Sequence, residues 1–162
     1  MIHIDFLADV PEFAPELARA ISAHWQTLLP EETYEERYRK LMSHNQKDRL
    51  PMAWVAHEQG RPLGTSALRV CDLNGREELT PWLAGVFVLP AHRGRGIASR
   101  LCRVAENHAW KLGYSRLYLH TPDQQALYRR LGWHTREQTL WGHIPTEIMD
   151  KTQSRLNHIR EA

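Results

Sequence analysis

The chain has 162 residues, of which 42% are hydrophobic and 25% are charged, which is the composition of an ordinary globular domain. Its net charge of only +2 with neutral histidines, and the interspersion of its acids and bases, argue against a nucleic-acid partner. No apolar run approaches the ~20 residues of a membrane span, and the N-terminus has no signal-peptide pattern. We therefore expect a cytoplasmic protein with neither a nucleic-acid nor a membrane partner.

Cysteine usage points to a reducing compartment. The chain has two cysteines, Cys71 and Cys102, which are far apart in sequence and lack metal-type spacing. Two free thiols are the simpler interpretation and one disulfide is the alternative. The sequence therefore predicts no metal site.

The first half of the chain predicts a strand, two helices and a hairpin. Residues 2–6 alternate as a half-buried strand does, and apolar residues at helical spacing predict one helix from Pro11 to a break at Pro30. A second helix is predicted after Pro30, with Tyr34, Tyr38, Leu41 and Met42 on one face. Residues 53–58 and 63–70 read as two antiparallel strands joined by a short turn at 59–62, followed by a polar loop at 72–80.

The second half alternates strands and helices. An apolar strand follows Pro81 and ends near Leu89, and an amphipathic helix runs from Ile97 to Leu112. After a strand at 115–120, Thr121 is the expected N-cap of a helix that Gly132 ends. Strands at 135–141 and 144–151 complete a single predicted domain over residues 1–151, and 152–162 is expected to be a C-terminal tail.

A basic, glycine-rich turn between the apolar strand and the amphipathic helix is the strongest functional signal. It reads His92-Arg93-Gly94-Arg95-Gly96-Ile97-Ala98. Unpaired N–H groups and the partial positive charge of a helix N-terminus favour a phosphate, and glycines let the backbone approach it closely. The turn therefore predicts binding of a phosphorylated cofactor.

The spacing in this turn distinguishes among nucleotide-binding motifs. The chain contains no Gly-Lys-Ser/Thr of a Walker loop, and Gly94-Arg95-Gly96 lacks the third glycine of a dinucleotide-binding fingerprint. Arg93-x-x-Gly96-x-Ala98 instead resembles the [Q/R]-x-x-G-x-[G/A] signature of the GNAT superfamily of acyl-CoA-dependent N-acetyltransferases. The later segment Ala126-Leu127-Tyr128-Arg129-Arg130-Leu131-Gly132-Trp133 resembles that family's tyrosine-bearing helix, with fewer residues before Tyr128.

This resemblance implies an α/β GNAT (acyl-CoA N-acyltransferase) fold. Its sheet is mixed, mostly antiparallel and seven-stranded, is flanked by helices, and is splayed between strands four and five, where acetyl-CoA lies as co-substrate. Backbone groups of Val86 and Val88 would pair with the pantetheine arm, and an N–H of Val86 or Phe87 would stabilise the oxyanion. The remaining cofactor-binding residues implied by the resemblance are Arg93, which orients the turn, and Gly94, Arg95, Gly96, Ile97 and Ala98, which receive the pyrophosphate.

The implied reaction is direct attack of an amine on the thioester, in which Tyr128 donates a hydrogen bond to the sulfur as it becomes a thiolate. The family often has a glutamate on the fourth strand as general base, but residues 81–89 contain no acid. Four side chains and water therefore stay open as the base: Asp72, Glu77, Glu78, His120 or a water chain.

The expected acceptor is a primary amine of a small molecule. Two alternatives remain, a protein or peptide N-acetyltransferase and a non-catalytic acyl-CoA-binding regulatory module, which the missing carboxylate favours. The sequence selects neither the amine nor the acyl group, and since relatives often dimerise, a homodimer is an alternative to a monomer. Aromatic residues of the first two helices and the late strands, such as Trp25, Tyr34 and Trp141, are candidates to line the acceptor pocket.

Overall fold

A computed structural model describes residues 1–153, and residues 154–162 of the predicted tail lie outside the described residues. The strands are β1 (His3–Phe6), β2 (Met52–Glu58), β3 (Arg61–Arg69), β4 (Trp82–Val88), β5 (Arg116–Thr121), β6 (His134–Trp141) and β7 (Ile144–Thr152). The α-helices are α1 (Ala14–Trp25), α2 (Tyr34–Met42), α3 (Ile97–Lys111) and α4 (Gln125–Arg130). Short 3₁₀ turns lie at Leu7–Asp9, Pro11–Phe13 and Pro90–His92. Thr152, predicted as the first tail residue, thus belongs to β7.

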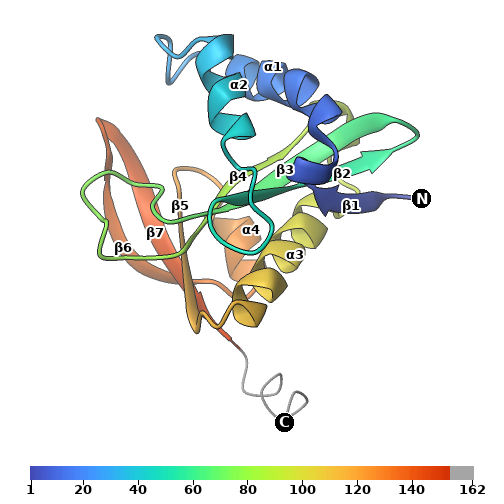
Figure 1. Cartoon of the computed structure of the whole chain (residues 1–162). Coiled ribbons are helices and arrows are strands. Elements are labelled where there is room, and N and C mark those ends of the chain that lie inside the picture. Colours follow the sequence, from blue (N-terminus) through green and yellow to red (C-terminus); the bar gives the residue numbers. More distant parts are fainter. Residues whose placement is uncertain (154–162) are drawn as a thin grey trace. The chain divides into compact units, whose positions relative to one another are not determined.

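The seven strands form one mixed sheet in the order β1-β2-β3-β4-β5-β7-β6 (Figure 1). The β1–β2, β2–β3, β5–β7 and β6–β7 pairs are antiparallel. β4 and β5 run parallel and register at Trp82 and Tyr118. The predicted α/β fold class, a mixed seven-stranded sheet with flanking helices, is confirmed.

The chain divides into two compact units. The first contains residues 1–68 and 85–105, and the second contains residues 69–84 and the described residues from 106 onward. β4 contributes Trp82–Ala84 to the second unit and Gly85–Val88 to the first. Each unit has its own core.

In the first unit, helices cover both faces of the strands. Figure 1 shows α1 and α2 on one face of β1–β3 and α3 on the other. The α1/α2 face is filled by a buried cluster: Leu7, Phe13, Ala14, Leu17, Ala18, Leu41, Ala53, Val55 and Ala67. On the α3 face, the buried hydroxyl of Ser66 donates to the carbonyl of Leu101 (3.0 Å).

The core of the second unit contains residues that the sequence placed in a polar loop. Leu73 and Leu79 are buried and pack with Trp82 of β4 and Ile148 of β7. The indole Nε1 of Trp82 donates to the carbonyl of Leu79 (2.5 Å), which fixes this loop to the strand that follows it. The expectation of a merely polar loop at 72–80 was therefore incomplete.

Two predicted helix starts were wrong, and local hydrogen bonding explains the second. Pro11 begins a 3₁₀ turn rather than α1, which starts at Ala14. Thr121 remains in β5, and its hydroxyl accepts from the N–H of Gln124 (2.9 Å), so the side chain closes a turn and α4 begins only at Gln125.

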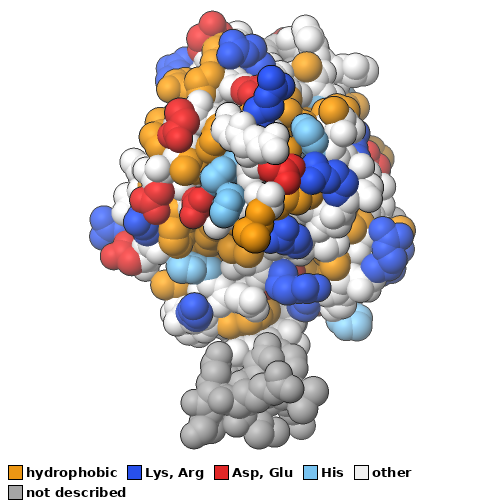
Figure 2. All heavy atoms as spheres, turned by 90° about the vertical axis from the view of Figure 1, so that its right-hand side faces the viewer, with side chains coloured by type: hydrophobic (Ala, Val, Ile, Leu, Met, Phe, Trp, Pro, Cys, Tyr) orange, Lys and Arg blue, Asp and Glu red, His pale blue; other side chains and the backbone are white. Residues whose placement is uncertain are grey.

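Within residues 1–153, no helix has both the length and the apolar character needed to cross a bilayer. Figure 2 shows acidic, basic and hydrophobic side chains together on one face. Neither cysteine forms a disulfide, and Cys102 is fully buried.

Candidate functional site: an anion-binding turn and the edge of β4

The glycine-rich turn joins the 3₁₀ turn after β4 to the first residue of α3. Gly94 and Gly96 adopt φ values of +82° and +75°, and a Cβ on either would meet open space. L-residues avoid this left-handed region at a cost of about 1–2 kcal/mol. The sequence therefore needs glycine here for backbone conformation, and the open space beside each Cα leaves room for a ligand.

The first turn of α3 directs backbone donors toward this space. The N–H of Arg100 bonds to the carbonyl of Gly96 (3.2 Å) and so makes the first bond of the helix. The preceding amides, from Ile97 to Ser99, have no acceptor in an α-helix. With the helix dipole, such amides favour an anion.

The two arginines of the turn have different contacts. Arg93 folds back along β4: its Nε donates to the carbonyl of Val88 (3.1 Å), and its guanidinium lies 5.7 Å from the Phe87 ring centroid. Arg95 pairs with Glu58 at the end of β2 (3.1 Å), and its hydrogen bond, followed by that of the N-terminal ammonium, lowers the pKa of Glu58. The arginines thus hold the turn against the two strands.

The edge of β4 beyond Gly85 presents alternate backbone groups to two sides. The N–H of Leu89 bonds to the carbonyl of Leu63 in β3 (2.9 Å), and the Phe87 oxygen would lie 2.6 Å from a Cβ on Gly64. The backbone N–H and C=O groups of Phe87 and Leu89 therefore point toward β3. Because successive residues of a strand alternate, the N–H groups of Val86 and Val88 face away from it.

This alternation gives different directions to the backbone groups of the three β4 residues that were predicted to hold the cofactor. The N–H groups of Val86 and Val88 point away from β3, so their predicted pairing with an extended ligand stays a prediction. The backbone groups of Phe87 are directed at β3, so of the two residues considered as oxyanion donor, the geometry favours Val86. Gly85 precedes them with φ +58°, a local bend of the kind that re-aims a strand edge.

Tyr128 lies in the second unit, on α4. Its side chain is buried, with its ring 6.3 Å from that of Trp133 in an edge-on arrangement, and its carbonyl accepts from the N–H of Trp133 (3.0 Å). Gly132, with φ +93°, makes the reversal that brings Trp133 back onto the helix. The motif residues Tyr128, Gly132 and Trp133 therefore act as one packed unit.

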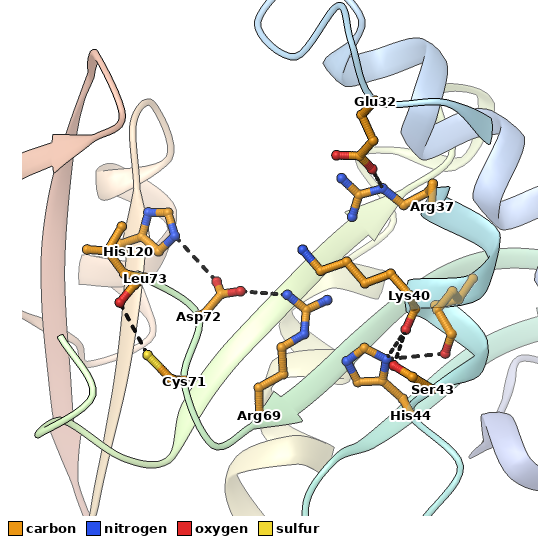
Figure 3. Close-up of polar contacts among 11 residues, drawn as sticks. Glu32, Arg37, Lys40, Ser43, His44, Arg69, Cys71, Asp72, Leu73 and His120 are labelled. Atoms are coloured by element: carbon orange, nitrogen blue, oxygen red, sulfur yellow. Dashed lines mark hydrogen bonds and ion pairs between the residues drawn. The ribbon is translucent and has the colours of Figure 1, made fainter. Parts of the chain in front are cut away.

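Two of the four side chains considered as general base belong to one polar chain in the second unit. Asp72 lies between Arg69 (Oδ1 to Nη1, 2.5 Å) and His120 (Oδ2 to Nε2, 3.4 Å), as Figure 3 shows. The other ring nitrogen of His120 is 3.0 Å from the Thr146 hydroxyl. Both imidazole nitrogens face protein groups and the side chain is 7% exposed, so this chain ties β5 to the loop after β3.

The other two carboxylates considered as base are engaged at the surface. Glu77 accepts from the N–H of Gly75 (3.0 Å). Glu78 pairs with Arg76 (2.6 Å), whose hydrogen bond lowers the pKa of this carboxyl. A lowered pKa makes Glu78 a poorer proton acceptor. Neither glutamate gains support as the base.

The chain is similar in sequence to known acetyltransferases. The sequence model of the acetyltransferase (GNAT) family matches residues 16–133. The chain belongs to this family. Among curated proteins, an uncharacterized N-acetyltransferase, YjgM of Escherichia coli strain K12, is 32% identical over 101 residues, which cover 59% of each chain. The match thus spans less than two thirds of the length of that relative.

Solved acetyltransferase structures share the fold over nearly the whole chain. An aminoglycoside 6'-acetyltransferase type Ii superposes with a TM-score of 0.73 at 19% identity, covering 93% of this chain and 96% of that one. An aminoglycoside 6'-N-acetyltransferase solved in complex with coenzyme A gives 0.71 at 17% identity, with coverage of 94% and 96%. A Streptococcus agalactiae acetyltransferase gives 0.71 at 17%, covering 94% and 98%.

The sequence did not indicate one residue at the β4 edge and two of the four residues of the polar chain. The ring of His24, at the end of α1, contacts Phe87, and no motif marked it because it is distant in sequence from the turn. Arg69 and Thr146 were also missed, because a lone arginine and threonine on strands carry no spacing signal. Of the aromatic candidates for the acceptor pocket, Tyr34 packs on the first core and Trp141 on the second.

Proposed function

We propose that this protein is an acetyl-CoA-dependent N-acetyltransferase that acetylates a primary amine of a small molecule by direct attack on the thioester. The observation that carries the proposal is the turn at residues 93–98, where positive-φ glycines precede the unpaired amides of α3. Family membership supports the reaction class. The aminoglycoside acetyltransferases among the structural neighbours support a small-molecule acceptor.

The residues present fit coenzyme A by two separate features. The turn offers backbone donors beside open space at Gly94 and Gly96, which suits a pyrophosphate. The β4 edge offers the Val86 and Val88 amides, which suit an extended arm with its own amide groups. Each charge-assisted hydrogen bond to the phosphates is worth about 1.5–3 kcal/mol.

The chemistry then needs donors at two atoms of the thioester. The N–H of Val86 is proposed to stabilise the carbonyl oxygen as it becomes an oxyanion. Tyr128 is proposed to donate a hydrogen bond to the sulfur. A phenol has an ordinary pKa near 10 and a thiol near 8.5, so complete proton transfer is uphill by about 2 kcal/mol. Tyr128 therefore acts as a hydrogen-bond donor to the developing thiolate.

Calorimetry and thiol release test the proposal. Coenzyme A should bind the whole chain with measurable heat, and acetyl-CoA should release thiol when an aminoglycoside, a polyamine, an amino acid amide or a peptide with a free N-terminus is added. Direct attack predicts intersecting double-reciprocal lines, whereas a covalent acetyl-enzyme gives parallel ones. No heat with coenzyme A would refute the binding site, and turnover on peptides alone would favour the protein acetyltransferase alternative.

A further inference from the structure

A histidine from α1 lies beside the segment of β4 that is proposed to receive the thioester. His24 is in the last turn of α1 and is exposed. Its ring centroid is 5.4 Å from that of Phe87, at 63°. The neighbouring ring of Trp25, 4.9 Å away and edge-on, flanks it on the helix. The histidine is thus held by two aromatic contacts and reaches β4 from the α1 side.

The contact with Phe87 places this imidazole near the proposed oxyanion donor. Val86 precedes Phe87, and consecutive Cα atoms are about 3.8 Å apart. The Phe87 side chain extends toward α1, whereas the Val86 N–H faces the edge away from β3. An amine that approaches this edge from the α1 side therefore passes His24.

The ring nitrogens of His24 are available for proton transfer. Its contacts are the two ring contacts, and within residues 1–153 neither nitrogen has a hydrogen-bond partner. This differs from His120, whose two nitrogens face Asp72 and Thr146. An exposed ring also exchanges protons directly with water.

We propose that His24 is the general base of the acetyl transfer, an assignment that rests on the function proposed above. A ring nitrogen of His24 takes one proton from the acceptor ammonium and passes it to solvent. The neutral amine attacks the thioester carbon, so that a C–N bond forms and the C–S bond breaks. The second amine proton goes to the departing sulfur, which leaves as the thiol. The net products are the amide, coenzyme A and one proton.

The charged surroundings of this base come from β4 and the turn after it. The guanidinium of Arg93 lies over the Phe87 ring that His24 contacts, with 5.7 Å between its carbon and the ring centroid. The aromatic residues Phe87 and Trp25 carry no charge. No carboxylate contacts His24 in the described chain, so the imidazole itself is the proton acceptor at this position.

Two variants of equal shape and different basicity test the assignment. His24→Gln removes the base, and kcat/KM should fall by about 10²–10⁴-fold, the usual contribution of general base catalysis. His24→Glu restores a proton acceptor and should stay within ~10-fold of wild type. Both should bind coenzyme A as wild type does in calorimetry. His134→Asn, at an exposed position of β6, is the control for loss of a histidine.

A purely structural role predicts the opposite order. A cationic histidine near a helix C-terminus is favourable and a carboxylate there is unfavourable, so the glutamate variant would then be the more damaged of the two. The pH profile adds a second criterion. Because an alkylammonium loses its own proton near pH 10, the deficit of His24→Gln should shrink as pH rises toward that value.

The possible failures are distinguishable. If wild type does not bind coenzyme A, the proposed function itself is wrong. If wild type turns over and His24→Gln matches it, or if the Glu and Gln variants are equally impaired, His24 is not the base. If coenzyme A binds but no amine of the panel causes thiol release, a catalytic role for His24 is also overturned, while the proposed cofactor site stands.

Discussion

The close approach of β3 to β4 at Gly64 gives a prediction that links packing to cofactor binding. A Cβ at residue 64 would lie 2.6 Å from the backbone oxygen of Phe87, 3.2 Å from the Val88 Cα and 3.2 Å from Leu101 Cδ1. Two of these atoms are backbone and do not rotate away. Gly64→Ala therefore forces β4 to move away from β3.

The size of the effect follows from these distances. Ordinary contact begins near 3.4 Å, so the strands must separate by about 0.8 Å. Overpacking costs up to about 3 kcal/mol, and the lower entropy of the unfolded alanine chain returns about 0.4–1 kcal/mol. Because the clashing atoms are backbone, we expect a net loss toward the upper end, up to about 2.5 kcal/mol, which lowers the melting temperature by up to ~10 °C for a chain of this length.

The same displacement moves the Val86 N–H, so affinity should fall with stability. Loss of one neutral hydrogen bond weakens coenzyme A binding by about 2–10-fold. Calorimetric unfolding and a coenzyme A titration measure the two effects. Gly75→Ala is the control, because Gly75 has φ +89° and open space, so strain lowers stability there without moving β4. An unchanged melting temperature and affinity in Gly64→Ala would contradict the tight approach.

Four further predictions address the site and its support. Tyr128→Phe should lower kcat with little change in coenzyme A affinity, measured by thiol release and calorimetry, and an unchanged kcat would remove Tyr128 from the mechanism. Gly96→Asp should abolish coenzyme A binding, since it adds a negative charge where the phosphates are proposed to lie and strains a φ of +75°. Lys151→Met should cost about 3–5 kcal/mol in denaturant unfolding, because Lys151 pairs with the buried Glu106 at 2.5 Å. Arg76 lowers the pKa values of Glu78 and Glu137 through hydrogen bonds. The resulting stability is present above the unfolded pKa near 4.5 and is lost as pH falls through the lowered pKa values of the folded state. Arg76→Gln should therefore flatten the acid side of a plot of melting temperature against pH.

The fold was predictable where local patterns and turn residues agree. The hairpin of β2 and β3 was predicted from its alternation, and its turn at Gln59–Gly60 has the two positive φ values that a tight hairpin requires. The helix start at Thr121 was wrong because the capping pattern has two outcomes. The same threonine hydroxyl that caps a helix also closes a turn at a strand end, and here β5 extends through Thr121.

The site was predictable where it is continuous in sequence. Residues 93–98 form one turn, so its glycines, cations and helix start can be read together. The direction of the Val86 and Phe87 amides could not be deduced, because it depends on which edge of β4 pairs with β3. A strand pattern gives the faces of a sheet but not the pairing of its edges.

The two arginines of the turn make contacts that the motif alone does not indicate. Arg93, which the resemblance assigns to orienting the turn, bonds to β4, and Arg95, which it assigns to the pyrophosphate, pairs with Glu58. A neutralised or folded-back cation contributes little free charge to an anion in water. The arginines fix where the Gly94–Ala98 backbone lies, and the amides of that backbone are the groups we propose to bind the phosphates. Substituting lysine at position 93 would keep the charge but lose the planar fork that reaches Val88 and stacks on Phe87, which is the physical reason for an arginine at this position.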